Sequence, residues 1–283
     1  MIARQPVRVL LIVAVAALLL LIVSEARAAT TVGASPPGKG TLQDCSAVLA
    51  APTDLIQVRA TEGNPFVVPA PGGVITSWRT VVVSGSMTAS LRLFTGNETQ
   101  VVPVAESASV SATPASSGPF PTRLSVSGGE ILGMKAFSPG GEIGCLAGPT
   151  LPTGAPYLMA FLPPLALGQP EPVINSLGGV LVSVAANVEP DSDADGFGDE
   201  TQDAFVAKGP KQKTTRTKAT FTLAGAGSFE CRVDKKPFAP CASGIKFKKL
   251  KERKHTFRVH AITPTGELSP DTPYKWRVVE KKK

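Results

Sequence analysis

Short β-rich runs separated by glycine and proline are the feature that most constrains the fold of residues 29–188. No helical periodicity of apolar residues runs through this block, whereas apolar and polar residues alternate over short stretches. Strands at roughly 8–15-residue spacing with Gly/Pro punctuation predict an all-β fold, an antiparallel and jelly-roll-like β-sandwich. The expected strands are Val74–Val83, Met87–Phe94, Thr99–Val104, Thr122–Val126, Ile131–Phe137, Glu142–Ala147, Tyr157–Leu162 and Val180–Val188.

The N-terminus has the three parts of a secretory signal peptide. Arg4 and Arg8 precede the unbroken apolar run Val9–Val23, and Ala26-Arg27-Ala28 follows it. The run is shorter than the roughly 20 residues that cross a bilayer. We therefore expect a signal-peptide helix in residues 1–28, cleavage after Ala28, and a mature protein that is extracellular or at the cell surface. Its contact with the membrane would then be transient, and retention of the segment as an anchor is the alternative.

The formal net charge of +7 is distributed in three blocks. Residues 29–188 hold six basic and eight acidic side chains, and residues 189–203 hold seven acidic and no basic ones. Residues 204–283 hold 20 basic and six acidic side chains, a net charge of +14. This asymmetry predicts a first domain at 29–188, an acidic connector at 189–203, a basic linker at 204–216 and a second domain at 217–283.

Four cysteines fit an oxidising compartment. Cys45 and Cys145 lie in the first block, and Cys231 and Cys241 lie in the last. Four cysteines allow three pairings, of which pairing within each domain is the simplest. No C-x-x-C motif is present, so redox-active thiols are not expected.

The connector, EPDSDADGFGDETQD, carries the one motif with defined chemistry. Alternating aspartates followed at once by Gly196 match the start of an EF-hand-type loop, in which positions one, three and five supply carboxylate oxygens. Position seven supplies a backbone carbonyl and position nine binds directly or through water. Bound Ca²⁺ would cancel the repulsion among seven clustered acids. The candidate ligands are Asp191, Asp193, Asp195, Phe197 through its carbonyl, Asp199 and Asp203.

With its DxDxDGxGD core, this segment resembles a single thrombospondin type 3 repeat. The resemblance implies that Asp191, Asp193, Asp195 and Asp199 bind calcium. The twelfth position is Gln202 rather than an acid, so Glu200, Gln202 or Asp203 is left to close the site. The other interpretation of residues 189–203 is a solvated acidic linker.

Aromatic residues in the last block predict a second small β core. Phe221, Phe229, Phe257 and Trp276 are expected to face it. The expected strands are Ala219–Ala224, Ser228–Val233, Pro237–Cys241, Gly244–Leu250, His255–Ile262 and Tyr274–Val279.

The string FECRVDKKPFAPC, followed by HTFRVHA and a Trp-containing strand, resembles the Ig-like, fibronectin type III-like modules of secreted bacterial proteins. The resemblance covers about residues 217–280. It implies an Ig-like β-sandwich with a Cys231–Cys241 disulfide, and it implies no catalysis. Residues 29–188 resemble no named family.

The sequence contains no recognised catalytic motif. His255, expected in a turn that enters a strand, and His260 are five residues apart, so they point to opposite faces. We therefore expect a non-catalytic binding or structural protein. The alternative is a secreted carbohydrate-active enzyme, which needs two first-block carboxylates within about 10 Å. The acids in question are Asp44, Asp54, Glu62, Glu98, Glu106, Glu130, Glu142 and Glu171.

Lysines of the last block cluster at 208–218, 246–254 and 281–283. One interpretation is attraction to a polyanion such as a cell-wall polymer or polysaccharide; the other is a solvated strand face. Aromatics interleaved for base stacking are lacking, so specific nucleic-acid binding is not expected.

Overall fold

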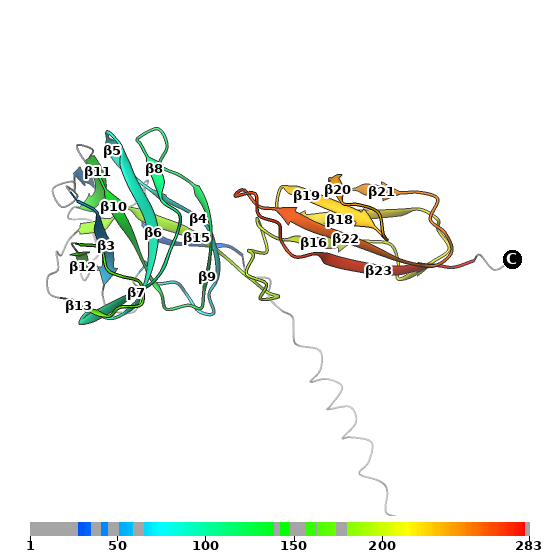
Figure 1. The fold of residues 1–283 in the computed structure, drawn as a ribbon, viewed down its shortest axis with the longest axis horizontal. Helices are drawn as coiled ribbons and strands as arrows, with labels where there is room; N and C mark the ends of the chain where they lie inside the picture. Colours follow the sequence, from blue (N-terminus) through cyan, green and yellow to red (C-terminus); the bar gives the residue numbers. More distant parts are fainter. Residues whose placement is uncertain are drawn as a thin grey trace, which may run out of the picture.

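The computed structural model describes residues 28–34, 41–44, 51–58, 65–138, 142–147, 157–161, 163–173 and 180–280. These residues form strands, turns and loops without a helix, in two bodies joined by the connector (Figure 1). The expectation of an all-β protein is confirmed. The expected signal-peptide helix falls on residues 1–27, which lie outside the described chain. Within the described chain, no helix has the length and apolarity needed to cross a membrane.

The first domain contains three sheets, and every strand pair among its described residues is antiparallel. One sheet has the order β1 (Thr30–Ala34), β15 (Val184–Glu189), β4 (Gly73–Thr80), β9 (Phe120–Val126). The second has the order β12 (Tyr157–Phe161), β3 (Thr53–Val58), β10 (Ile131–Phe137), β6 (Met87–Gly96), β7 (Gln100–Glu106), β13 (Glu171–Pro172), with β8 (Val110–Ala112) paired to β6. The third has the order β14 (Val180–Val182), β11 (Glu142–Ala147), β2 (Thr41–Asp44), with β5 (Val82–Ser84) paired to β11.

A single apolar core joins the first two sheets. Trp78 of β4, Leu91 of β6 and Met134 of β10 are each at most 1% exposed and belong to one cluster. The hydroxyl of Thr80 donates to the sulfur of Met134 at 3.6 Å, which brings β4 against β10. Alternating strand residues supply this core because successive side chains point to opposite faces of a sheet. The first block is therefore a β-sandwich, as predicted.

Most expected strands are present, and three of them, β10, β11 and β19 (Ser228–Val233), have the predicted ends. Two expected strands are each divided. Val74–Val83 becomes β4 and β5, and Val180–Val188 becomes β14 and β15. In both cases the two halves belong to different sheets, so the chain changes sheet within one apolar run.

The second domain is also a sandwich, and it is built from two sheets. Its three-stranded sheet has the order β16 (Ala204–Lys208), β18 (Ala219–Gly225), β21 (Ile245–Phe247). Its five-stranded sheet has the order β17 (Lys213–Thr214), β23 (Thr272–Val278), β22 (Lys254–Ile262), β19, β20 (Ala239–Cys241). Residues 204–216, expected to be a linker, thus contribute two strands, because β16 pairs with β18 and β17 runs parallel to β23.

Stacked aromatic rings fill the core of the second domain. Phe221 lies face to face with Phe257, with ring centroids 4.1 Å apart, and Trp276 meets Phe221 edge-on at 5.3 Å. With Phe229, these are the four predicted core residues, and each is at most 9% exposed. His255 lies within β22 rather than in a turn before it, and its ring is 5.2 Å from that of Trp276.

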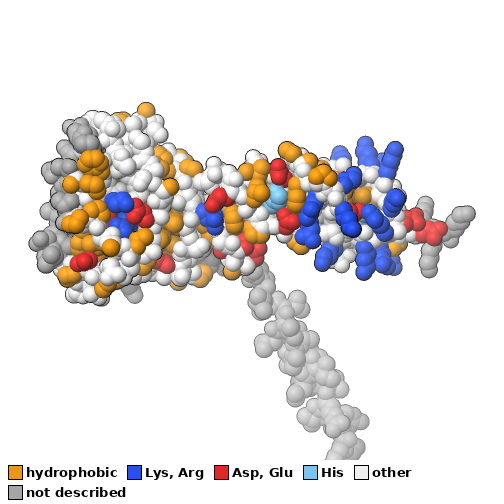
Figure 2. Space-filling model, in the orientation of Figure 1, with side chains coloured by type: hydrophobic (Ala, Val, Ile, Leu, Met, Phe, Trp, Pro, Cys, Tyr) orange, Lys and Arg blue, Asp and Glu red, His pale blue; other side chains and the backbone are white. Residues whose placement is uncertain are grey.

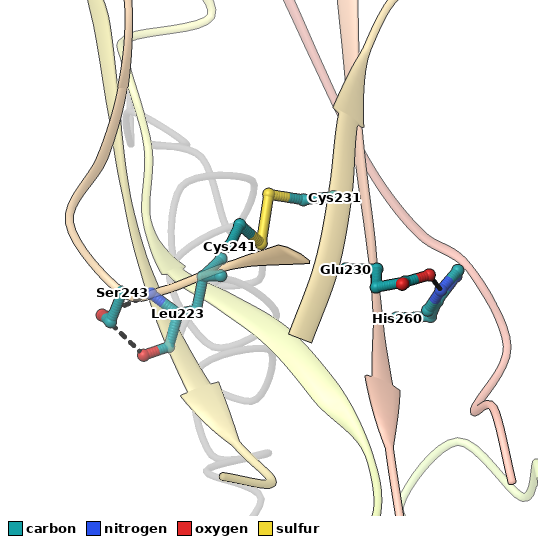
Figure 3. The surroundings of a disulfide bond; sticks show 6 residues. All are labelled: Leu223, Glu230, Cys231, Cys241, Ser243 and His260. Atoms are coloured by element: carbon teal, nitrogen blue, oxygen red, sulfur yellow. Dashed lines mark hydrogen bonds and ion pairs between the residues drawn. A yellow bond between two sulfur atoms is a disulfide. The ribbon is translucent and has the colours of Figure 1, made fainter. Parts of the chain in front are cut away.

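A disulfide joins Cys231 of β19 to Cys241 of β20, whose Cα atoms are 6.0 Å apart (Figure 3). The pairing implied by the Ig-like resemblance is therefore confirmed. Beside it, the hydroxyl of Ser243 accepts from the N–H of Leu223 at 2.9 Å and donates to its carbonyl at 3.0 Å. The disulfide and Ser243 thus fix the β20–β21 segment against both sheets.

The other expected disulfide involves Cys45, which lies outside the described residues. The strand before it, β2, pairs with β11, and Gln43 is opposite Cys145 in that register. The Cys45–Cys145 pairing stays a prediction.

Candidate metal centre in the connector

The three alternating aspartates of the connector converge. One carboxylate oxygen from each of Asp191, Asp193 and Asp195 lies within 4.8 Å of the other two. The loop is closed by its own first residue, because the Asp191 carboxylate accepts the N–H groups of Asp195 and Gly196, both at 3.0 Å. Gly196 has φ 83°, the left-handed conformation that favours glycine at this sharp turn. The three aspartates and the turn at Gly196 thus form one compact loop, and calcium binding there stays a prediction.

Asp199, the ninth residue of the loop, folds back against its start. Its carboxylate accepts from the Ser192 hydroxyl at 2.6 Å and from the Ser192 N–H at 3.2 Å. Both interactions hold Asp199 beside the Asp191–Asp195 turn. Four of the predicted ligands therefore lie on one short loop between β15 and β16.

The three candidates for closing the site differ in their surroundings. The Glu200 carboxylate accepts the backbone N–H of Ala29 at 2.8 Å. The Gln202 side-chain amide donates to the Thr122 carbonyl at 2.6 Å, toward the first domain. Asp203 is 7% exposed, and its Oδ1 has no hydrogen-bond partner. The Oε1 of Gln202 is also buried without a partner, but Gln202 carries no charge, whereas the charges of Asp193 and Asp199 act on Asp203.

The electrostatics of the cluster disfavour the ionised forms of Asp195 and Asp203 in the absence of a counter-ion. Burial raises the pKa of Asp195 to about 6. The hydrogen bond from Phe197 N–H opposes this rise, and the charges of Asp203, Asp193 and Asp191 add to it. Burial also raises the pKa of Asp203, with further contributions from Asp193 and Asp199. A divalent cation among these oxygens would remove this repulsion, because it favours the ionised form of every ligand.

Phe197 has a second role that its sequence position did not reveal. Its ring is 8% exposed, and the Arg123 guanidinium lies over it at 4.5 Å from the centroid. Arg123 belongs to β9, so this cation–π contact attaches the loop to the first domain. The backbone-carbonyl role predicted for Phe197 stays a prediction.

Glu189, counted in the sequence only as one of seven connector acids, anchors the end of the loop. It is 2% exposed, and its carboxylate accepts from the hydroxyls of Thr76 at 2.8 Å and Thr201 at 2.5 Å. It also accepts the N–H groups of Glu200 and Thr201 at 3.0 and 2.8 Å. Gly198 fits beneath it, because a Cβ there would lie 2.5 Å from Thr76 Cγ2. The only sequence signal for the anchoring role of Glu189 was its position at the end of an expected strand.

The connector also contacts the second domain directly. Ala226 N–H donates to the Asp203 carbonyl at 2.8 Å. Burial raises the pKa of the Asp203 carboxyl group, and Ala204 and the Ser269 side chain partly offset that effect. The last acid of the loop is therefore built into the second sandwich.

The two histidines point to opposite faces of β22, as predicted. His255 Nδ1 lies 2.9 Å from Asp234 Oδ2 on the core side. His260 lies between two carboxylates on the outer face, 3.0 Å from Asp271 Oδ1 and 3.2 Å from Glu230 Oε2. Figure 3 shows the contact with Glu230. Each histidine thus has local partners, and the two rings share none.

Among the first-domain acids, Asp54 and Glu106 lie together around Arg92. Arg92 Nη1 is 2.5 Å from Asp54 Oδ2, and Arg92 Nε is 3.6 Å from Glu106 Oε2. Asp54 is 0% exposed and also accepts the N–H of Leu165 at 2.8 Å. Glu62 lies outside the described residues, and nothing is described of the Asp44 and Glu142 side chains.

No family model matches this chain, and no curated protein matches it. Among solved structures, similarity is found to the extracellular domain of a one-component system from B. thetaiotaomicron, with 8% identity, 66% of this chain and 29% of that chain covered, and a TM-score of 0.24. A second similar structure is the glycoside hydrolase domain of Endo-D from Streptococcus pneumoniae R6, which is 9% identical with a TM-score of 0.19. The match covers 88% of this chain and 37% of that chain. A third similar structure is Bacteroides uniformis beta-glucuronidase 3, which is 10% identical with a TM-score of 0.20. The match covers 84% of this chain and 34% of that chain.

This chain spans about a third of the length of those three proteins.

Proposed function

We propose that this is an exported, non-catalytic protein in which the connector binds one Ca²⁺ and thereby holds two β-sandwiches in a fixed relation. The observation that carries the proposal is the convergence of one carboxylate oxygen from each of Asp191, Asp193 and Asp195 within 4.8 Å. Asp203 is not part of that group, but its buried Oδ1 has no hydrogen-bond partner and its charge acts on Asp195. A buried carboxylate oxygen without a hydrogen-bond donor is unfavourable. Direct coordination would supply the missing partner.

The chemistry of the ligand set favours calcium. Carboxylate and carbonyl oxygens are hard ligands, and Ca²⁺ takes six to eight of them. Asp191, Asp193, Asp195, Asp199 and Asp203 would supply carboxylate oxygens, and the Phe197 carbonyl would supply another. Neither histidine nor cysteine lies among these residues, which argues against zinc.

A cation in this loop would act on the joint because the loop contacts both domains. Glu189 and the ring of Phe197 connect it to the first domain. Asp203 connects it to the second. Ordering the loop therefore limits the rotation of one sandwich relative to the other.

Two further observations support export. The Cys231–Cys241 disulfide suits an oxidising compartment, and the N-terminal segment has the pattern of a secretory signal peptide. We therefore place the protein at the cell surface or outside the cell.

A carbohydrate-active enzyme is the less favoured function. The described acids of the first domain that lie together, Asp54 and Glu106, share Arg92, and Glu106 also pairs with Lys135. Asp54 has no exposed surface through which a substrate could reach it. This arrangement fits a buried charge network that stabilises the seven-stranded sheet.

The test is calcium titration of the exported full chain by calorimetry, together with melting in Ca²⁺ or EDTA. We expect saturable binding of one ion and a higher melting temperature in Ca²⁺. Asp193→Asn with Asp195→Asn should abolish both effects while raising the melting temperature in EDTA, since it removes repulsion. Glu252→Gln, an exposed acid of the second domain, is the control and should behave like the parent. Absence of binding and of a calcium-dependent shift in the parent protein would refute the proposal.

A further inference from the structure

The outer face of the five-stranded sheet is strongly basic. On β22, His255, Phe257 and Val259 point into the core, so Lys254, Thr256 and Arg258 point outward. On β23, Trp276 and Val278 are buried, and the exposed Lys275 and Arg277 point outward. Figure 2 shows Lys and Arg side chains gathered on the second domain, most densely on the half farther from the first domain.

The strand register places like charges directly opposite each other on this face. Lys254 is paired with Arg277, and Arg232 is paired with Arg258. Like charges in directly opposed positions destabilise an antiparallel pair. Asp271 offsets the repulsion between Arg232 and Arg258, because its Oδ2 lies 3.6 Å from Arg232 Nη2 and 3.8 Å from Arg258 Nη1.

The Lys254–Arg277 pair has no such compensation. Within the described part of the chain, no carboxylate lies within ion-pair distance of Lys254, Lys275 or Arg277. Repulsion between Lys254 and Arg277 therefore lowers the stability of the second domain, and no described carboxylate of the chain compensates for it. A bound anionic ligand would offset this repulsion.

A hollow of about 610 Å³ lies over the same face. Its lining includes the basic residues Lys235, Lys236, Arg253, Lys254 and Arg258. It also contains one acid, Asp234, whose carboxylate is occupied by Arg253, His255 and the N–H of Thr256. Lysines 235, 236 and 254 are left to face solvent.

We infer that this face binds a linear anionic carbohydrate polymer. The inference adds a partner to the proposed function and depends on the protein being exported, but not on calcium in the connector. Charge complementarity and an extended, open surface favour a chain that carries regularly spaced carboxylate or phosphate groups.

Two other polyanions fit this face less well. Nucleic acid would need aromatic rings for stacking, but the rings of Phe221, Phe257 and Trp276 are buried against one another. A membrane surface would be expected to meet exposed apolar side chains. The large apolar side chains exposed in the described part of this domain are Phe205 and Leu268, in the segments that adjoin the connector.

The test measures binding of the exported full chain to polygalacturonate and to a ribitol-phosphate polymer. Single-stranded oligo(dT) and phosphatidylglycerol vesicles serve as comparators. We expect saturable binding to at least one carbohydrate polymer, tighter than to either comparator, and much weaker at about 200 mM than at about 50 mM salt. Tighter binding to DNA or vesicles, or no polymer binding at low salt, would overturn the inference.

Variants locate the surface. Lys254→Glu with Arg277→Glu should weaken polymer binding by about tenfold or more. Lys246→Glu with Lys248→Glu makes the same change of net charge next to and within β21, in the other sheet, and should have a clearly smaller effect. Equal loss in the two variants would mean that net charge alone is responsible, and the assigned face would be wrong.

Lys254→Glu alone separates function from folding. It converts the like-charge pair with Arg277 into an opposite-charge pair. We expect binding to fall while the melting temperature of the domain rises by about 1–5 °C. The double variant Asp193→Asn, Asp195→Asn should bind the polymer as tightly as the parent, because the basic face does not depend on calcium in the connector. The polymer experiment therefore remains a valid test even if the calcium proposal fails. Unchanged polymer binding in Lys254→Glu would contradict the inference.

Discussion

Arg123 of the first domain and Glu267 of the second form a two-point ion pair, with Nε 2.8 Å from Oε2 and Nη2 3.1 Å from Oε1. The same guanidinium covers the Phe197 ring and approaches the Gly196 carbonyl at 3.5 Å. One side chain therefore touches both sandwiches and the loop between them. The hydrogen bond between the two partners raises the pKa of Arg123 and lowers that of Glu267.

Arg123→Gln is expected to loosen the relation between the domains without unfolding either one. The pair is partly exposed, so its loss should change the free energy of unfolding by at most about 1 kcal/mol. Small-angle scattering in Ca²⁺ should show a broader distribution of interdomain distances than in the parent. Arg79→Gln, an exposed arginine on β4, is the matched control. An unchanged distance distribution in Arg123→Gln would show that the ion pair does not restrain the joint.

Asp203→Asn is expected to lower calcium affinity by about tenfold, because calcium affinity depends on the number of charged ligands. The same change should stabilise the calcium-free protein, since burial and the charges of Asp193 and Asp199 raise the pKa of this carboxyl group. Calorimetry with Glu200→Gln as the comparison distinguishes the candidates. If Glu200→Gln weakens binding and Asp203→Asn does not, Glu200 closes the site.

Asp234 is expected to control the acid stability of the second domain. Partial burial acts to raise its pKa, but hydrogen bonds from His255 and Thr256 and the charges of His255 and Arg253 outweigh burial and lower it. Because the folded pKa lies below the unfolded value near 3.8, the stabilisation is present above that pH and is lost as the pH falls through the folded pKa.

Asp234→Asn tests this assignment. Asp234 has φ 56°, a conformation that asparagine tolerates, so the substitution removes mainly the charge. The free energy of unfolding at neutral pH should be lower by about 1–2 kcal/mol than in the parent protein. Below about pH 4 it should decrease less steeply with falling pH. Urea unfolding followed by Trp276 fluorescence between pH 3 and 7 measures both. Parallel pH profiles for parent and variant would contradict the prediction.

Removal of residues 1–28 is expected to create a new ion pair. Ala29 would then carry an α-ammonium group where its N–H now donates to Glu200 Oε1 at 2.8 Å. Mass spectrometry of the exported protein should show an N-terminus at Ala29. Glu200→Gln should lower stability by a few tenths of a kcal/mol in this form, and by less after N-terminal acetylation, because the pair is exposed. An exported protein that keeps residues 1–28 would support the membrane-anchor alternative.

Strands were predictable where apolar content or alternation is clear in the local sequence. Ile131–Phe137 and Ser228–Val233 show clear alternation or apolar content and were located at both ends. Thr53–Val58 was missed because Asp54 and Gln57 interrupt its apolar pattern, although every residue of the strand is buried. Asp54 and Gln57 have partners that are distant in the chain, and a local pattern cannot reveal them. Arg92 donates to Asp54, while Gln57 bonds to the Val180 carbonyl and the Val182 N–H.

The loop of the candidate metal centre was also predictable, because it is local. Asp191 and Gly196 act within six residues, so spacing alone specifies their hydrogen bonds. The role of Glu189 was not predictable, since its partner Thr76 is 113 residues away.

The amino-acid sequence by itself determined the all-β class, the division into two sandwiches and the aspartate loop, because periodicity, charge blocks and short-range spacing are local properties. Only the tertiary structure decided what surrounds that loop. Folding brings Arg123 over Phe197 and against Glu267, buries one oxygen of Asp203 without a partner, and sets Lys254 opposite Arg277. These relations join residues that are distant in the chain, and they depend on sheet order and register, which no local pattern specifies.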